Sequence, residues 1–184
     1  MKQIIIWKGL YYQSLEYCEI RMSDAQVEVD STIIGVHNGA PYKVDYLLMA
    51  GPNWATLSCK IKIRVGEADD VRTFQHDGRG NWTCNGASLD ECKGATEIDI
   101  SVTPFTNSLP INRLKMPVGE SRRIQVVYID VLGGTVRSAT QQYTRISGDE
   151  FRYENVPNDF EAVITVDESG IVREYPELFT RQKD

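Results

Sequence analysis

The stretch Cys59–Val65, with the sequence Cys-Lys-Ile-Lys-Ile-Arg-Val, alternates strictly between apolar and basic side chains. Successive side chains of a β-strand point to opposite faces of a sheet, so this alternation predicts a strand with one buried and one solvated face. Cys59 falls on the apolar face, where a free thiol packs as a small hydrophobe.

Strand-like runs of the same kind recur along the chain and are separated by turns rich in Gly, Asn and Asp. Helical periodicity is hard to find, and a short helix is expected only near Glu177–Arg181. The sequence therefore predicts an all-β, antiparallel fold with little helix. The further expected strands include residues 27–29, 42–48, 97–102, 124–131, 151–155, 161–166 and 171–174.

The segment Thr103–Ile111, Thr-Pro-Phe-Thr-Asn-Ser-Leu-Pro-Ile, contains two prolines. Proline fixes φ, removes a backbone donor and pushes the residue before it into an extended conformation. We therefore expect neither a helix nor a central strand here, but a shaped loop or a broken edge of the sheet. Two interpretations stay open: a loop that grips a ligand, and a corner that steers the sheet.

A weak internal repeat links the two halves of the chain. The motif Asp-x-x-Gly begins at Asp77 and again at Asp167, an offset of 90 residues, and the strand pattern around both is similar. The alternative is that this motif is a common hairpin turn that recurs by chance. We expect a single domain, 1–184, with two repeats at about 1–92 and 93–184 if the chain is duplicated.

The chain of 184 residues carries 20 Lys and Arg against 26 Asp and Glu, a net charge near −6. Nucleic-acid binding needs a basic face that neutralises phosphates, so this balance argues against it. No apolar run approaches the roughly 18 residues of a transmembrane helix. The N-terminal apolar run Ile4–Trp7 is too short for the h-region of a signal peptide, so we expect a cytoplasmic protein.

The sequence lacks recognisable metal, cofactor and nucleophile motifs. The two histidines are His37 and His76, and the four cysteines lack the paired spacing that zinc prefers. We therefore expect free thiols, no cofactor, no metal and no catalytic residue. The alternative is an acid–base pair of His76 and Asp77, although Asp77 is also explained as the turn residue before Gly78.

Aromatic residues are abundant, and core packing explains most of a set that includes Tyr128, Tyr153, Phe160 and Tyr175. An aromatic-rich curved sheet can also line an apolar ligand cavity, with a few hydrogen-bonding groups at its mouth. We predict such a ligand-binding site. Its candidate residues are Trp54, Trp82 and Phe105 for the wall, Tyr143 as a further aromatic, and Asp77, Thr106, Asn107 and Arg113 for the polar contacts.

The segments 15–18, 54, 77–82, 89–92, 103–111 and 175–181 recur in this order in one known family. Through them the chain resembles the bacterial family of putative glycolipid-binding proteins. The motifs T-P-F-T-N-x-L-P-I and Y-P-x-L-F-x-R are its most specific parts. The resemblance implies a spiral or rolled sheet, of half-barrel or β-roll type, related to lipoprotein carriers, and it implies glycolipid binding.

The chain departs from this family pattern at two positions. Glu91 stands where a glycine is expected before Cys92, which would loosen that turn. Asn112 stands where a second arginine is common beside Arg113, so an anionic head group would be held less well.

These observations lead to one main functional hypothesis and two alternatives. The main hypothesis is a non-catalytic β-roll that binds a lipid or glycolipid in a concave, aromatic-lined cavity. The first alternative is a small-molecule hydrolase or lyase that uses Asp77 and His76. The second is a protein-interaction module whose aromatic patch meets a partner, with a homodimer as one form.

Overall fold

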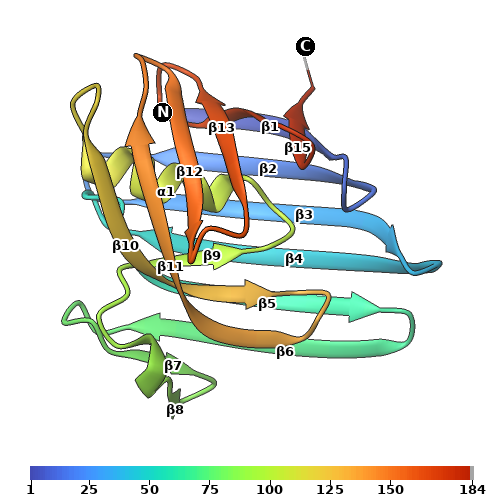
Figure 1. The fold of residues 1–184 in the computed structure, drawn as a ribbon. Coiled ribbons are helices and arrows are strands. Elements are labelled where there is room, and N and C mark those ends of the chain that lie inside the picture. Colours follow the sequence, from blue (N-terminus) through green and yellow to red (C-terminus); the bar gives the residue numbers. More distant parts are fainter. Residues whose placement is uncertain (183–184) are drawn as a thin grey trace.

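The computed structural model describes residues 1–182 and shows one continuous sheet of 15 strands and one α-helix (Figure 1). The first eight strands are β1 (Lys2–Gly9), β2 (Ser14–Met22), β3 (Val27–His37), β4 (Ala40–Ala50), β5 (Thr56–Val65), β6 (Ala68–His76), β7 (Trp82–Cys84) and β8 (Ala87–Ser88). The other elements are the 3-10 helix η1 (Asp90–Cys92), β9 (Glu97–Ile100), α1 (Phe105–Leu114), β10 (Ser121–Asp130), β11 (Thr135–Arg145), β12 (Glu150–Val156), β13 (Glu161–Val166), β14 (Val172–Tyr175) and β15 (Phe179–Arg181). The predicted all-β sheet with little helix is confirmed.

The strand order is β8-β7-β6-β5-β4-β3-β2-β1-β15-β14-β13-β12-β11-β10-β9. Strands that follow one another in sequence are therefore neighbours in the sheet, except β8 and β9, which lie at its two ends. In the middle of the sheet β1 pairs with β15 and joins the two halves. Within residues 1–182, all pairs of strands are antiparallel except β9 and β10, which run parallel. Parallel neighbours need a crossover connection, and α1 lies in that connection.

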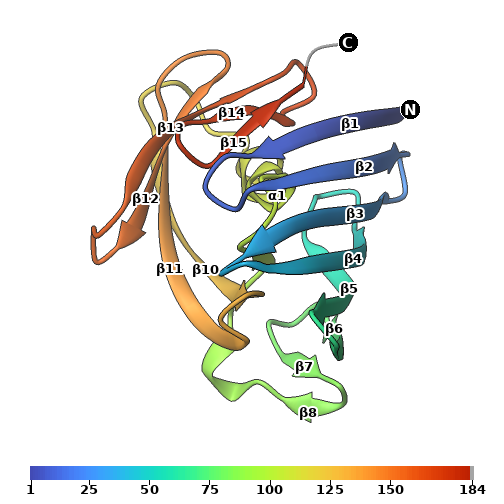
Figure 2. The same ribbon diagram turned by 90° about the vertical axis from the view of Figure 1, so that its right-hand side faces the viewer.

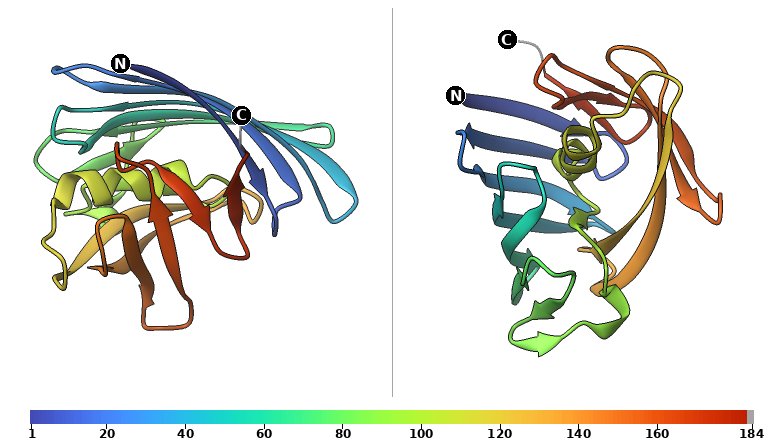
Figure 3. Two further views of the ribbon diagram at one scale, coloured as in Figure 1. Left: turned by 90° about the horizontal axis from the view of Figure 1, so that it is seen from above. Right: turned by 90° about the vertical axis from the view of Figure 1, so that its left-hand side faces the viewer.

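The sheet curls so that β1–β5 and β10–β12 face each other across α1 (Figures 2 and 3). On β5 the inward residues Cys59, Ile61 and Ile63 are at most 5% exposed, whereas Lys60 and Lys62 point to solvent. The predicted alternation of this strand is thus confirmed. Its apolar face belongs to the larger of two core clusters, and the smaller cluster packs β11–β15 against the C-terminal part of α1.

The segment Thr103–Ile111 is not a loop, and the prediction that its prolines exclude a helix is wrong. Pro104 is the N-cap of α1, where a missing backbone donor costs nothing because the first-turn N–H groups have no helical partner. Thr103 supplies the cap instead, since its Oγ1 accepts a hydrogen bond from the backbone N–H of Phe105 at 3.1 Å.

Pro110 lies inside α1, where a proline costs about 3 kcal/mol because it removes a helical hydrogen bond. Tertiary packing offsets this cost. Phe105 and Leu109 are fully buried in the larger core cluster, and each contributes about 1.5–3 kcal/mol by burial. Ile111 faces the smaller cluster. The helix therefore forms because both of its faces are covered.

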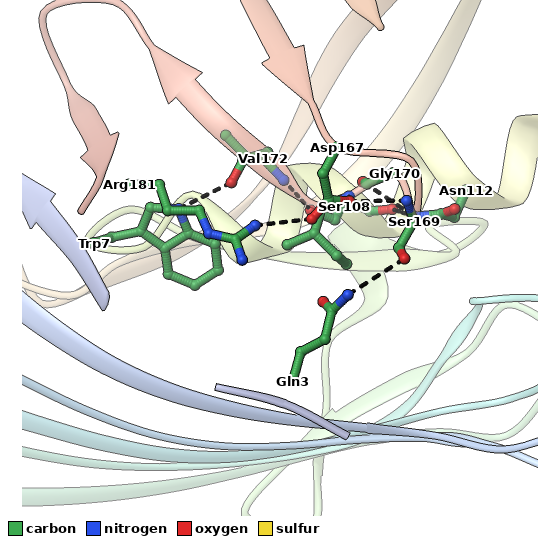
Figure 4. Close-up of polar contacts among 10 residues, drawn as sticks. Gln3, Trp7, Ser108, Asn112, Asp167, Ser169, Gly170, Val172 and Arg181 are labelled. Carbon is green, nitrogen blue, oxygen red and sulfur yellow. Dashed lines mark hydrogen bonds and ion pairs between the residues drawn. The ribbon is translucent and has the colours of Figure 1, made fainter. Parts of the chain in front are cut away.

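Polar contacts fix α1 to the middle of the sheet, at β14 and the turn before it (Figure 4). The Oγ of Ser108 accepts the backbone N–H of Val172 at 3.2 Å, and Asn112 donates from Nδ2 to the carbonyl of Gly170 at 3.1 Å. From β1, Trp7 donates from Nε1 to the carbonyl of Val172 at 3.0 Å. The β13–β14 turn is thereby held between α1 and β1.

The helix expected near Glu177–Arg181 is also absent. Residues 176–178 form a turn, and Phe179–Arg181 is strand β15. The reason is tertiary: β15 pairs with β14 on one side and β1 on the other, for example Trp7 opposite Arg181. Two flanking strands satisfy its backbone groups better than one isolated helical turn would.

The two Asp-x-x-Gly turns have the same hydrogen bonds. The carboxylate of Asp77 accepts the N–H of the second and fourth residues after it, and its own N–H bonds to the carbonyl of Asn81. Asp167 does the same with the second and fourth residues after it and with the carbonyl of Ile171. Both are turn residues, and each turn connects two paired strands, β6 to β7 and β13 to β14.

Candidate functional site

A cavity of about 440 Å³ lies at the N-terminal end of α1, on the concave face of the second half. Its volume falls within the range of roughly 300–1,000 Å³ that is usual for small-molecule sites. We call it the tyrosine cavity. It is lined by Tyr11, Tyr12, Asp99, Ile100, Ser101, Thr103, Asn107, Tyr128, Arg137, Ala139, Gln141, Tyr153, Asn155, Phe160, Tyr175, Glu177 and Leu178.

Six aromatic rings form the wall of the tyrosine cavity, and most of them contact one another. Tyr153, Phe160 and Tyr175 are mutual neighbours, with ring centroids 5.8 to 6.1 Å apart and tilted by 49 to 62°. Tyr11 and Tyr12 meet edge to face at 5.1 Å. Tilted ring contacts of this kind are favourable and hold the wall rigid.

The carboxylate of Asp99 is the central polar group of the cavity. Its Oδ1 accepts a hydrogen bond from the hydroxyl of Thr106 at 2.9 Å, and its Oδ2 accepts one from Nε2 of Gln141 at 2.6 Å. Burial raises the pKa of Asp99, while these two hydrogen bonds and the charge of Arg137 oppose that effect. The pKa of Asp99 is raised overall, because hydrogen bonds from two neutral groups stabilise the charged carboxylate less well than water does.

Strand β9 explains why Asp99 lies there. Ile98 and Ile100 point into the larger core cluster, so Glu97 and Asp99 share the opposite face, which α1 covers. Glu97 forms an ion pair with Arg113 at the other end of the helix. Asp99 has no such cationic partner within 4.0 Å in residues 1–182.

Tyrosine hydroxyls surround this carboxylate. Burial, followed by the charge of Asp99, raises the pKa of Tyr128 to about 12. Burial is also the main cause that raises the pKa of Tyr12, Tyr153 and Tyr175, and Asp99 contributes in each case. The four hydroxyls therefore stay protonated at neutral pH and can donate hydrogen bonds.

Of the residues predicted from the sequence, Asn107 lines the tyrosine cavity and two others lie directly behind its wall. Asn107 donates from Nδ2 to the hydroxyl of Tyr143 at 2.9 Å, and that hydroxyl donates to Oε1 of Gln141 at 3.3 Å. Thr106 bonds to Asp99 as described. These three candidates orient the groups that face the cavity.

The other predicted residues lie elsewhere. Phe105 and Trp82 are buried in the larger core cluster, and Trp54 packs against it. Arg113 is paired with Glu97. The last candidate residue, Asp77, is exposed to solvent in the turn between β6 and β7.

The hydrogen bonds of the turn lower the pKa of Asp77 to about 2, first through the side chain of Asn81 and then through backbone N–H groups. His76 contacts the carbonyl of Thr56 through Nδ1 at 3.1 Å and accepts the N–H of Gly80 through Nε2 at 3.1 Å. Both members of the proposed acid–base pair are thus occupied in holding the turn.

A second cavity, of about 610 Å³, lies at the C-terminal end of α1. Its lining includes Phe151 as its one aromatic ring, and its Arg145 is occupied by the carbonyls of Met116, Ser147 and Gly148. It is larger but lacks an aromatic wall. The tyrosine cavity is therefore the better candidate site.

Sequence reasoning missed the residues that build this site. Tyr128, Tyr153 and Tyr175 were grouped with core aromatics, and Asp99 was not among the candidate residues. The available signal was the pattern Glu-Ile-Asp-Ile at 97–100, which places carboxylates on one face of a strand that comes directly before α1. The pattern indicates a binding site only once it is known that α1 covers this face of the strand.

Two features are absent from the part of the chain that the structure describes. Among the described residues, no group of three or more His, Cys, Asp or Glu side chains is arranged to hold a metal ion. No helix within residues 1–182 is long and apolar enough to cross a membrane.

The comparisons with known proteins agree with this fold. The sequence profile of the family described as "Putative glycolipid-binding" matches residues 4–181. A DUF1089 family protein from Pseudomonas aeruginosa, known from its crystal structure, is 33% identical and superimposes with a TM-score of 0.80. The match covers 91% of this chain and 92% of that one. No curated protein matches the chain.

Proposed function

Because the chain belongs to the putative glycolipid-binding family, we propose that its tyrosine cavity binds the head group of a glycolipid or related amphiphile, without catalysis. The observation that carries this proposal is the combination of an aromatic wall with convergent polar groups, Asp99, Asn107 and Gln141. Aromatic rings stack on the apolar faces of sugars, and carboxylate and amide groups bond their hydroxyls.

The apolar tail of such a ligand would leave the head group along the half-buried side chains of Phe160 and Leu178, which line the same cavity. Each CH₂ group removed from water there contributes about 0.8 kcal/mol. Four or five such groups would therefore contribute as much as several hydrogen bonds.

Native mass spectrometry of gently purified protein, followed by titration with octyl glucoside, tests the proposal. We expect a co-purified amphiphile or saturable octyl glucoside binding. The variant Phe160→Ala should weaken that binding roughly tenfold, because it removes a ring of the wall. Leu47→Ala, which removes an exposed side chain from β4, is the matched control and should have no effect. Failure of all amphiphiles to bind would disprove the proposal.

A further inference from the structure

The tyrosine cavity contains a carboxylate without a positive partner. Glu97, two residues before Asp99 on the same strand, is paired with Arg113. Asp99 is bonded only to the neutral donors Thr106 and Gln141, and it faces the cavity. Arg137 acts on Asp99 only from beyond ion-pair distance. A carboxylate that is removed from water without a cation in contact is unfavourable, so this site can accept a further positive group.

From this arrangement we propose that the head group bound in the tyrosine cavity carries an organic ammonium group, which lies against Asp99 and the tyrosine rings. This inference rests on the proposed function, since it concerns the same cavity and ligand. An ammonium group supplies the missing counter-charge, and the negative faces of aromatic rings attract it further. Quaternary ammonium groups are commonly recognised by such a combination of rings and carboxylate.

The wall of the cavity already attracts one cation. The guanidinium carbon of Arg137 lies over the ring of Tyr128, 4.7 Å from its centroid, although Arg137 itself is exposed. The charged side chains that line the cavity are Asp99, Glu177 and Arg137, so carboxylates outnumber cations there. The exposed Arg137 and Glu177 are at the rim, and Asp99 is the charge that a bound head group would meet inside.

Two probes of equal shape test the charge of the ligand. Choline carries a permanent positive charge, and 3,3-dimethyl-1-butanol replaces its nitrogen by carbon. Isothermal titration or ligand-observed NMR should show choline binding at least roughly tenfold tighter than the alcohol. Equal affinity of the two probes would overturn the inference.

Three variants separate the groups involved. Asp99→Asn should weaken choline binding at least roughly tenfold, and by a clearly larger factor than it weakens octyl glucoside binding. Choline loses its counter-charge, whereas the asparagine amide can still form hydrogen bonds with sugar hydroxyls. Glu177→Gln removes a carboxylate from the exposed rim and should change choline affinity much less. Arg137→Gln should strengthen choline binding, because it removes a like charge and exposes the face of Tyr128; a weakened affinity would overturn the inference.

The outcomes distinguish this inference from the function on which it rests. If octyl glucoside binds but choline binds no tighter than the alcohol, the inference of an ammonium group is overturned and the proposed amphiphile site remains. Binding of neither choline nor octyl glucoside overturns both. A choline preference that persists unchanged in Asp99→Asn shows that the charge is recognised elsewhere and also overturns the inference.

Discussion

Asn107 on α1 donates a hydrogen bond from Nδ2 to the hydroxyl of Tyr143 on β11, at 2.9 Å. This bond joins the helix to the layer behind the tyrosine cavity, and Asn107 also lines the cavity. Phe105, two residues earlier, is fully buried in the larger core cluster and does not line it. One short segment therefore provides both a binding edge and an architectural anchor, and the two roles can be separated by mutation.

Replacing the anchor should cost stability. Phe105→Ala removes a fully buried ring, and we expect the free energy of unfolding to fall by about 3–5 kcal/mol. Denaturant unfolding monitored by circular dichroism measures this loss. The folded fraction should still bind octyl glucoside with nearly the original affinity. A variant as stable as the parent protein would contradict the assignment of Phe105 to the core.

Replacing Asn107 should reduce both stability and ligand affinity, with a smaller loss of stability and a larger loss of affinity than replacing Phe105. Asn107→Ala leaves the buried hydroxyl of Tyr143 without one partner, which costs about 1–3 kcal/mol of stability. It also removes a polar group from the cavity, so octyl glucoside binding should weaken roughly tenfold. Unchanged affinity in folded Asn107→Ala would make the segment purely architectural.

A buried carboxyl makes the stability of this fold depend on pH. Glu16 is 2% exposed, and its Oε1 accepts hydrogen bonds from Ser31, Tyr46 and Thr103. Burial is the main effect on this group and raises the pKa of Glu16 from 4.5 to about 7. Between these values the folded state holds a proton that the unfolded state has lost, so stability falls as pH rises.

The variant Glu16→Gln tests this dependence. Because glutamine does not ionise, the cost of the charge, on the order of 3 kcal/mol, is absent from the variant. Relative to the parent protein, Glu16→Gln should therefore be more stable at pH 8 than it is at pH 5. Urea unfolding at both pH values measures the difference. A difference of the opposite sign would show that Glu16 is stabilised as a carboxylate.

Local patterns in the sequence were enough to predict strands such as β5, but they predicted neither α1 nor the strand β15. The alternation at Cys59–Val65 is a property of adjacent residues, and β5 forms there as expected. For α1 the local signal points the wrong way, because Pro110 opposes a helix and only burial of Phe105 and Leu109 stabilises it. The tyrosine cavity could not be predicted either, because its residues come from several elements that are distant in sequence and meet only in the folded protein.

The internal repeat predicted from the sequence would give α1 a structural explanation. Shifted by 90 residues, β2 (14–22) falls on 104–112, the position of α1, while β3–β7 fall on β10–β14. We propose that α1 replaces the second strand of the repeat. Loss of a middle strand would leave its first and third strands adjacent and parallel, as β9 and β10 are. Superposition of β3–β7 on β10–β14 in a crystal structure checks this, and a poor overlap would contradict it.

The affinity of the tyrosine cavity for choline should depend on pH through Asp99. Choline has a permanent charge, and the pKa of each facing tyrosine is raised. Because burial raises the pKa of Asp99, the carboxylate is lost at higher pH than an ordinary aspartate would be. Choline Kd should therefore increase as the pH falls, and Asp99→Asn should flatten this profile. A pH-independent Kd in the parent protein would contradict the role of Asp99.

Two glycines separate backbone strain from steric contact with α1. Gly39 and Gly170 both have positive φ, at 79° and 72°. A Cβ at Gly39 would meet nothing within 4 Å, whereas one at Gly170 would lie 2.5 Å from the side chain of Asn112. Gly39→Ala should therefore cost about 1 kcal/mol from strain alone. Gly170→Ala should cost about 1–3 kcal/mol more, because the amide of Asn112 must move away and give up its hydrogen bond to the carbonyl of residue 170.

Thermal unfolding of both variants measures this difference, and a double variant identifies its cause. Asn112→Ala alone removes the hydrogen bond to the carbonyl of Gly170 and should be mildly destabilising. Added to Gly170→Ala it should be neutral or stabilising, because the clash is then absent and the two changes couple. Simple additivity of the two losses would show that the β13–β14 turn is not held against α1 by this contact.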